Sequence, residues 1–107
     1  MPRSAAKIAK PLDRDALIAL LRALLPGLRE RYNVRSLGLF GSYARGEADA
    51  RSDVDLLVEF DTSPGFFRFA ELESLLEDTL GAKVDLVTRG ALKPSIGRRV
   101  LSEVIDL

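Results

Sequence analysis

A seven-residue segment, 54–60, constrains the fold of this chain more than any other feature. Its sequence, VDLLVEF, repeats apolar side chains at a period of two, which is the repeat of a β-strand. One face of that strand carries Val54, Leu56, Val58 and Phe60. The opposite face carries Asp55, Leu57 and Glu59. The segment therefore predicts a strand that turns an apolar face to the core and presents acidic side chains on the other side.

Leucines at helical spacing predict a helix ahead of that strand. They recur from Asp13 onward, and Asp13 or Asp15 is placed to cap the first turn through a side-chain oxygen. Pro26 interrupts the pattern, because proline lacks the N–H of an internal helical hydrogen bond. We expect Pro26 to kink the helix or to end it near Leu25, with a weaker turn continuing to about Tyr32.

Two more segments have the pattern of strands. Residues 34–40 alternate and are rich in residues that favour strands, and they run into a tight turn at Gly41-Ser42. Residues 42–51 are small, polar and charged, so we expect a short helical turn over 42–45 followed by a loop. Residues 83–87 predict a short third strand, with Val84 and Leu86 facing inward and Asp85 facing the other way.

The remaining apolar residues indicate two more helices. The first follows a turn at 63–65 and stops at Gly81, a natural C-cap. Its predicted apolar stripe consists of Phe66, Phe69, Leu72, Leu75, Leu76 and Leu80. We expect the phenylalanines to lie in the core rather than to stack on nucleic-acid bases. The second begins near Pro94, which suits a first helical position, and carries Ile96, Val100, Leu101, Val104 and Ile105.

Length and composition exclude several classes of function. With 107 residues, we expect a single domain over 11–107, preceded by a flexible basic tail at 1–10. The 16 basic and 16 acidic residues leave no net charge to attract nucleic acid or an anionic membrane. Cysteine and histidine are absent, so any metal must be bound by oxygen ligands. No apolar run approaches the roughly 20 residues of a membrane span, and we expect a soluble, cytoplasmic protein.

Three aspartates are the candidate catalytic residues. Asp53 and Asp55 lie two positions apart at the start of a strand, so both carboxylates point to one side. Two like charges this close are unfavourable unless a cation lies between them. Asp85, on the neighbouring predicted strand, could add a third carboxylate, and three such oxygens at one edge can hold two Mg²⁺ ions. A solvated strand edge is the competing interpretation of the isolated Asp-x-Asp.

The segment between the first two strands carries candidate nucleotide-binding residues. Gly41 and Ser42 are small enough to let backbone N–H groups approach a phosphate, although such a pair is also common in a simple turn. Arg45, followed by Gly46, could hold the loop through hydrogen bonds to a carboxylate or could bind a phosphate in a bidentate manner. These alternatives remain open for each residue taken alone.

Taken together, these residues resemble a known family. Gly41-Ser42, Arg45-Gly46 and Ser52-Asp53-Val54-Asp55, leading into the apolar run 56–58, are similar to the DNA polymerase beta-type nucleotidyltransferase superfamily, and most similar to its minimal nucleotidyltransferase family. The resemblance is densest over 39–60. It implies an α+β fold of the α/β-sandwich type, with a short mixed β-sheet flanked by about four helices.

The resemblance also implies a reaction. ATP would be the substrate and two Mg²⁺ ions the cofactors, with Gly41, Ser42, Arg45 and Ser52 binding the nucleotide. Asp53, Asp55 and Asp85 would be the catalytic metal ligands, and Asp85 could take the proton of the acceptor hydroxyl. Larger members of the superfamily carry a further helical domain, whereas here only a short helix is expected after residue 87, so we expect a partner to complete the site.

The resemblance further implies the identity of that partner. Minimal nucleotidyltransferases of this kind resemble the antitoxins of prokaryotic modules whose toxin is an α-helical HEPN-family RNase, and the implied reaction is AMP transfer to a tyrosine of that toxin. The alternatives are a non-catalytic antitoxin that neutralises its partner by binding, and nucleotidyl transfer to a small molecule. Four basic residues could bind triphosphate or an acidic partner surface, or form a solvated face: Arg89, Lys93, Arg98 and Arg99. Nucleic acid is an unexpected partner because the chain lacks a basic, aromatic stripe.

Overall fold

One mixed sheet organises the part of the chain that this computed structural model describes, residues 13–107. Its strands are β1 (Val34–Phe40), β2 (Val54–Phe60), β3 (Val84–Thr88) and β4 (Ile105–Asp106). The helices are α1 (Arg14–Tyr32), α2 (Gly41–Arg45), α3 (Gly65–Leu80), a 3-10 turn η1 (Arg89–Ala91) and α4 (Pro94–Glu103). The predicted α+β class, a short mixed sheet with about four helices, is confirmed. The predicted tail at 1–10 lies outside the described residues.

The strand order, β3-β2-β1-β4, places β2 in the interior of the sheet. β2 pairs antiparallel with β1 on one side and parallel with β3 on the other. A parallel pair needs a crossover, which α3 provides. In this register Asp55 of β2 lies opposite Phe40, the last residue of β1, and opposite Asp85 of β3. The topology therefore brings three separate segments together around Asp55.

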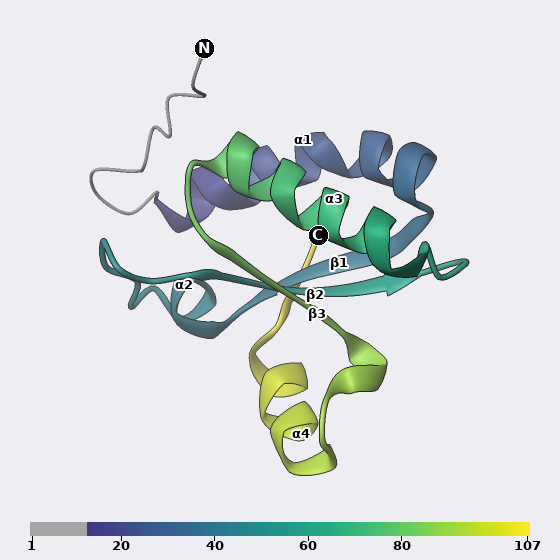
Figure 1. Ribbon diagram of the computed structural model, residues 1–107. Coiled ribbons are helices and arrows are strands. Elements are labelled where there is room, and N and C mark those ends of the chain that lie inside the picture. Colours follow the sequence, from purple (N-terminus) through teal and green to yellow (C-terminus); the bar gives the residue numbers. More distant parts are fainter. Residues whose placement is uncertain (1–12) are drawn as a thin grey trace.

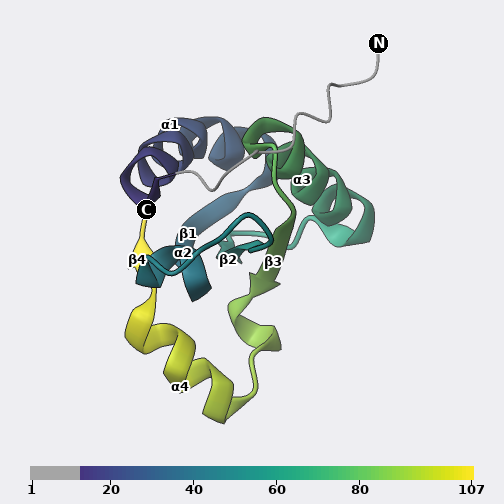
Figure 2. The same cartoon turned by 90° about the vertical axis from the view of Figure 1, so that its left-hand side faces the viewer.

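Two helices cover one face of the sheet. α1 and α3 lie together on that face, and α4 extends from the opposite side (Figures 1 and 2). The core lies between the sheet and these two helices, and its fully buried side chains include Leu17, Leu21, Leu39, Leu56, Leu72 and Leu76. Tyr32 at the end of α1 is also buried, and its hydroxyl donates a hydrogen bond of 2.8 Å to Glu71 of α3. The apolar face predicted for 54–60 is thus confirmed as the centre of the core.

Helix α1 begins as predicted and ends later than predicted. The Asp13 carboxylate accepts hydrogen bonds from the backbone N–H groups of Asp15 and Ala16. The expectation that Pro26 could end the helix near Leu25 is wrong, because α1 continues to Tyr32. Pro26 is exposed, whereas Leu25 and Leu28 on either side of it are buried. Burial of the residues around the proline stabilises the last turns despite the hydrogen bond that Pro26 cannot make.

Three of the apolar residues predicted to face the core are exposed instead. The Phe66 side chain is 79% exposed, that of Ile96 is 53% exposed and that of Leu101 is 44% exposed. Phe66 lies about a third of a helical turn away from Leu72, so it does not share the line of buried leucines on α3. Ile96 lies in the first turn of α4, a helix that packs mainly against α2 rather than against a broad layer. Phe69, by contrast, is partly buried against the core as expected.

The C-terminal residues differ most from the prediction. Val104 and Ile105 were expected in the last helix, but α4 ends at Glu103 and Ile105 begins β4. β4 pairs antiparallel with β1, with Gly38 opposite Asp106. Gly38 permits this close approach, because a Cβ atom at that position would lie 2.5 Å from Cγ2 of Val104. The free backbone edge of β1 therefore outweighs the helical spacing of these residues.

Helix α3 protects the outer edge of β3. The Val84 N–H donates a hydrogen bond of 3.0 Å to the Glu77 carboxylate, and the Leu86 N–H donates one of 3.3 Å to the Glu73 carboxylate. These N–H groups point away from β2 and would otherwise form an open edge that another strand could pair with. The two glutamates also hold β3 against α3. They thereby help to fix Asp85, which lies between Val84 and Leu86 in the sequence.

The contact at Gly38 yields a test of the C-terminal strand. We expect Gly38→Ala to lower the free energy of unfolding by about 1 kcal/mol or more, because the new methyl group overlaps Val104. The double variant Gly38→Ala/Val104→Ala should recover much of that loss in urea denaturation. Gly27→Ala is the matched control, since nothing lies within 4 Å of its Cβ position in α1, and it should be neutral or slightly stabilising. If Gly38→Ala lowers the free energy of unfolding by the same amount in the wild-type chain and in a Val104→Ala background, the proposed contact between residues 38 and 104 is contradicted.

Candidate active site

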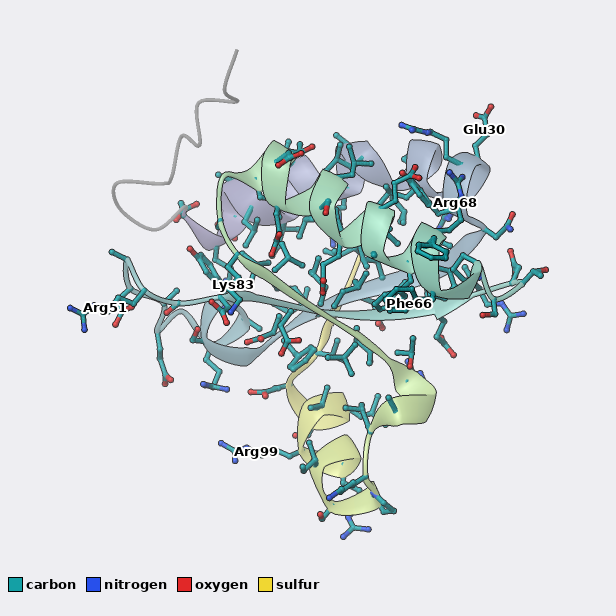
Figure 3. The ribbon with its side chains drawn as sticks, viewed as in Figure 1. Glu30, Arg51, Phe66, Arg68, Lys83 and Arg99 are labelled. Carbon is teal, nitrogen blue, oxygen red and sulfur yellow. The ribbon has the colours of Figure 1, made fainter. Side chains whose placement is uncertain are left out.

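The predicted site residues gather at one end of the sheet. Gly41 and Ser42 directly follow β1, Asp53 directly precedes β2, and Asp55 and Asp85 are paired across β2 and β3. Arg51, in the loop between α2 and β2, and Lys83, directly before β3, mark this end in Figure 3, whereas Glu30 and Arg68 lie at the other end. Residues from three segments that the sequence singled out therefore lie at the same end of the sheet.

The tightest contact in this neighbourhood joins the turn after β1 to Asp55. Gly41 has a φ of 75°, in the left-handed region that disfavours residues with a side chain. A Cβ atom at Gly41 would lie 2.1 Å from Oδ2 of Asp55. Only glycine fits both constraints. The first turn of α2, with backbone N–H groups that have no partner within the helix, is consequently held directly against this carboxylate.

Asp55 is the electrostatic centre of the site. Burial raises the pKa of its carboxyl from the ordinary 3.8 to about 6, and the negative charges of Asp85 and Asp53 raise the pKa further in the same direction. The Arg45 guanidinium opposes the shift, and Glu103 adds to it. A half-buried carboxylate surrounded by other carboxylates favours a bound cation, because a positive charge removes the repulsion that raises the pKa.

The three aspartates do not form a ready-made metal cage. Among residues 13–107, no group of three acidic side chains is arranged closely enough to hold one ion. Asp85 is exposed, whereas Asp53 and Asp55 are partly buried. Asp55 thus interacts with each of the other two, and the assignment of all three as metal ligands stays a prediction.

Ser52 helps to shape the loop that leads into the aspartates. Its hydroxyl accepts a hydrogen bond of 2.9 Å from the Asp49 N–H, and the Asp49 carboxylate in turn accepts one of 2.8 Å from the Arg51 N–H. The Ser52 N–H donates to the Asp49 carbonyl at 3.0 Å. These bonds close a tight turn immediately before Asp53. The structure accounts for Ser52 as a loop residue, and its predicted contact with nucleotide stays a prediction.

Arg45 is held by two carboxylates. Its Nε lies 3.0 Å from Glu47, and its Nη1 lies 2.9 Å from Glu103 at the end of α4. The first of the two sequence interpretations, a guanidinium that holds the loop through carboxylates, is present in the structure. Glu103 was missed by the sequence reading, because a partner 58 positions away leaves no local spacing signal.

The four other basic residues that the sequence analysis singled out have no contact with this cluster in the structure. Arg89 forms an ion pair of 3.3 Å with Glu59 of β2, and Lys93, Arg98 and Arg99 are exposed. Figure 3 shows Arg99 extending outward from α4. No contact in the structure assigns a ligand to these four residues.

A pocket of about 500 Å³ lies between the start of α1 and α2. It is lined by Asp13, Arg14, Asp15, Tyr43, Arg45, Gly46 and Ala48. The Arg14 guanidinium fixes one wall by donating a hydrogen bond of 3.1 Å to the Ala44 carbonyl. None of the three site aspartates lines this pocket, so it is separate from the carboxylate cluster.

Comparison with known proteins gives this arrangement a family. Residues 21–107 match the family model described as nucleotidyltransferase domain. The chain is 48% identical over 94 residues to protein adenylyltransferase MntA of Thermococcus cleftensis, covering 88% of this chain and 95% of that protein. The chain belongs to the nucleotidyltransferase domain family and is one of its minimal members.

Solved structures agree with this assignment. A protein provisionally assigned as a minimal nucleotidyltransferase superposes with a TM-score of 0.77 and 40% identity, covering 90% of this chain and 97% of that one. A chain from the crystal structure of a toxin–antitoxin pair with AMP-PNP superposes with a TM-score of 0.64 and 26% identity, covering 89% and 72%. The predicted nucleotidyltransferase fold is confirmed. Within residues 13–107 we find no helix that is long and apolar enough to cross a membrane.

The raised pKa of Asp55 yields a test by stability. Since the pKa is about 6 in the folded chain and 3.8 ordinarily, the folded state binds the proton more tightly, so this contribution to stability is present at low pH and lost as the pH rises through about 6. We expect Asp55→Asn to raise the free energy of unfolding by about 1 kcal/mol at pH 7.5 in the presence of chelator, after allowance for solvent screening. Near pH 4 the difference should nearly vanish.

The matched control for that measurement is Asp61→Asn at the other end of β2. Asp61 forms an exposed ion pair of 2.8 Å with Arg35, so its loss should lower the free energy of unfolding slightly at pH 7.5. The two aspartates thus predict changes of opposite sign. A loss of stability in Asp55→Asn at pH 7.5 would contradict the repulsive environment inferred for Asp55.

Proposed function

We propose that this chain is a Mg²⁺-dependent protein adenylyltransferase that transfers AMP from ATP to a tyrosine hydroxyl of a partner HEPN-family RNase toxin, and that it acts as the antitoxin. The observation that carries the proposal is the half-buried Asp55, held against the Gly41 turn and facing Asp85. Nucleotidyl transfer needs phosphate-binding backbone next to metal-binding carboxylates, and the contact between the Gly41 turn and the Asp55 carboxylate supports the proposal for that reason.

The donor set suits Mg²⁺. Magnesium prefers oxygen ligands and usually takes one or two protein carboxylates together with phosphate oxygens and water. Asp53 and Asp55 would supply carboxylate ligands, and Asp85 would supply a further one. The three aspartates do not form a complete metal cage on their own, so phosphate oxygens and water would supply the other ligands. When bound there, Mg²⁺ would neutralise charge on the triphosphate and lower the pKa of the attacking hydroxyl.

The residues of the chain divide the remaining work. Backbone N–H groups at Gly41 and Ser42 hold the terminal phosphates of ATP. Arg45 and Ser52 also bind the nucleotide. Asp85 accepts the proton of the acceptor hydroxyl. The hydroxyl oxygen forms a bond to the α-phosphorus, the bond from that phosphorus to the bridging oxygen breaks, and pyrophosphate leaves. The enzyme forms no covalent intermediate in this scheme.

The partner is inferred from relatives and from the architecture. Within residues 13–107, the broad layer of α1 and α3 covers one face of the sheet, and α4 extends from the opposite side (Figures 1 and 2). We infer that a second chain supplies the acceptor. A relative with 48% identity is named a protein adenylyltransferase, and a structural neighbour is part of a toxin–antitoxin pair with bound AMP-PNP. These two relatives support a folded toxin protein as the acceptor of AMP.

The reaction can be tested by mass spectrometry. The chain should be incubated with ATP, Mg²⁺ and the product of the adjacent gene, which the proposal expects to be a HEPN protein. We expect the HEPN protein to gain the mass of one or more AMP groups on tyrosine, and we expect a chelator to abolish the gain. Asp53→Ala/Asp55→Ala should lower the rate by at least a hundredfold, because it removes the predicted metal ligands. Asp61→Asn, at the far end of β2, should retain the rate.

Two outcomes would contradict the proposal in different ways. If the wild-type chain neutralises the toxin without AMP incorporation, and the double aspartate variant neutralises it equally, the chain is a binding antitoxin and not an enzyme. If AMP is transferred to a small molecule but to no protein, the chemistry stands and the partner is wrong.

A further inference from the structure

Arg45 and Glu103 form the one long-range ion pair that contacts the candidate site within residues 13–107. Nη1 of Arg45, the last residue of α2, lies 2.9 Å from Oε2 of Glu103, the last residue of α4. Nε of the same guanidinium lies 3.0 Å from Glu47. Two of its three nitrogens are therefore fixed by carboxylates that come from different parts of the chain.

This pair is more sheltered than a comparable one elsewhere. The side chains of Arg45 and Glu103 are 38% and 20% exposed, whereas those of Arg35 and Asp61 are 61% and 63% exposed. A sheltered pair is screened less by water and salt. Both pairs join an arginine to a carboxylate at less than 3 Å, so the second pair provides a matched reference for the first.

Arg45 lies at the same end of the sheet as Asp55. Gly41, the first residue of α2, lies against the Asp55 carboxylate, and Arg45 is the last residue of this five-residue helix, which contacts β2. The positive charge of Arg45 also lowers the pKa of the Asp55 carboxyl. The guanidinium therefore adds positive charge close to the carboxylates where the triphosphate is proposed to bind.

We propose that Glu103 is a positioning residue that holds the Arg45 guanidinium beside Asp55, ready to bind the triphosphate. Glu103 itself touches neither substrate nor metal and acts through Arg45. This inference rests on the proposed function, since it assumes that Mg·ATP binds at the Gly41 turn. A guanidinium that is already fixed loses less side-chain entropy when phosphate binds, so Glu103 increases the affinity for the nucleotide.

The same pair connects the C-terminal helix to the nucleotide. α4 packs mainly against α2, and Val104 alone separates Glu103 from β4. Positioning of Arg45 consequently depends on residues 94–106 being folded in place. A substitution that detaches this region should weaken nucleotide binding without touching an aspartate.

The test measures Mg·ATP affinity of the full chain by calorimetry, with AMP transfer as a second readout. We expect Glu103→Gln to raise the Kd for Mg·ATP about fivefold, and we expect the Kd of Glu103→Asp to lie between those of wild type and Glu103→Gln. Arg45→Gln should weaken binding further, and Glu103→Gln/Arg45→Gln should bind no worse than Arg45→Gln alone, because Glu103 acts through Arg45. In AMP transfer, Glu103→Gln should raise KM for ATP and leave kcat nearly unchanged.

Asp61→Asn separates positioning from stability. It removes an arginine–carboxylate pair of similar length, so it should lower the melting temperature slightly, and it should leave Mg·ATP affinity at the wild-type value. If Glu103→Gln binds Mg·ATP as tightly as wild type, or if the double variant is clearly weaker than Arg45→Gln, the inference is wrong. If wild type binds Mg·ATP and transfers no AMP, the proposed reaction fails and the affinities still decide the role of Glu103. If wild type does not bind Mg·ATP, both are contradicted.

Discussion

The close approach of Gly41 to the Asp55 carboxylate is the constraint on which the rest of the site depends. A Cβ atom at position 41 has no room there, and the backbone of Gly41 adopts a left-handed conformation. The contact holds the turn that begins α2 against a carboxylate in the interior of the sheet. It also shields Asp55 from water, and this burial is the main cause of its raised pKa. Backbone donors and a carboxylate that favours a cation are thereby placed side by side.

The sequence predicted the parts of the molecule that local pattern determines. Alternation over 54–60 identified β2 and its buried face, Asp13 was identified as a helix cap, and Gly81 as a helix end. Asp53 and Asp55 could be placed on one side because strand geometry fixes that relation within three residues. Asp85 could be placed on a neighbouring strand, but its position opposite Asp55 follows from the parallel register of β2 and β3, which local pattern does not determine.

The features that escaped prediction all depend on distant contacts. Helical spacing at 104–105 gave no sign that the open edge of β1 would recruit these residues as a strand. Phe66 is apolar, as core residues are, but it lies on the solvent-exposed side of α3. The partner of Arg45 is 58 positions away in sequence. In each case the outcome is decided by which surface another segment presents, and this information is not contained in the spacing of neighbouring residues.

The central claim is that the end of the sheet beneath the Gly41 turn binds a divalent cation together with a nucleoside triphosphate. Crystals grown with Mn²⁺ and a non-hydrolysable ATP analogue would test it directly by anomalous scattering. The account predicts a manganese peak coordinated by Asp55 and Asp53, with the triphosphate bound at Gly41 and Ser42. A fully bound analogue whose metal and phosphates lie away from Asp55, for example in the pocket beside Arg14 and Tyr43, would contradict it.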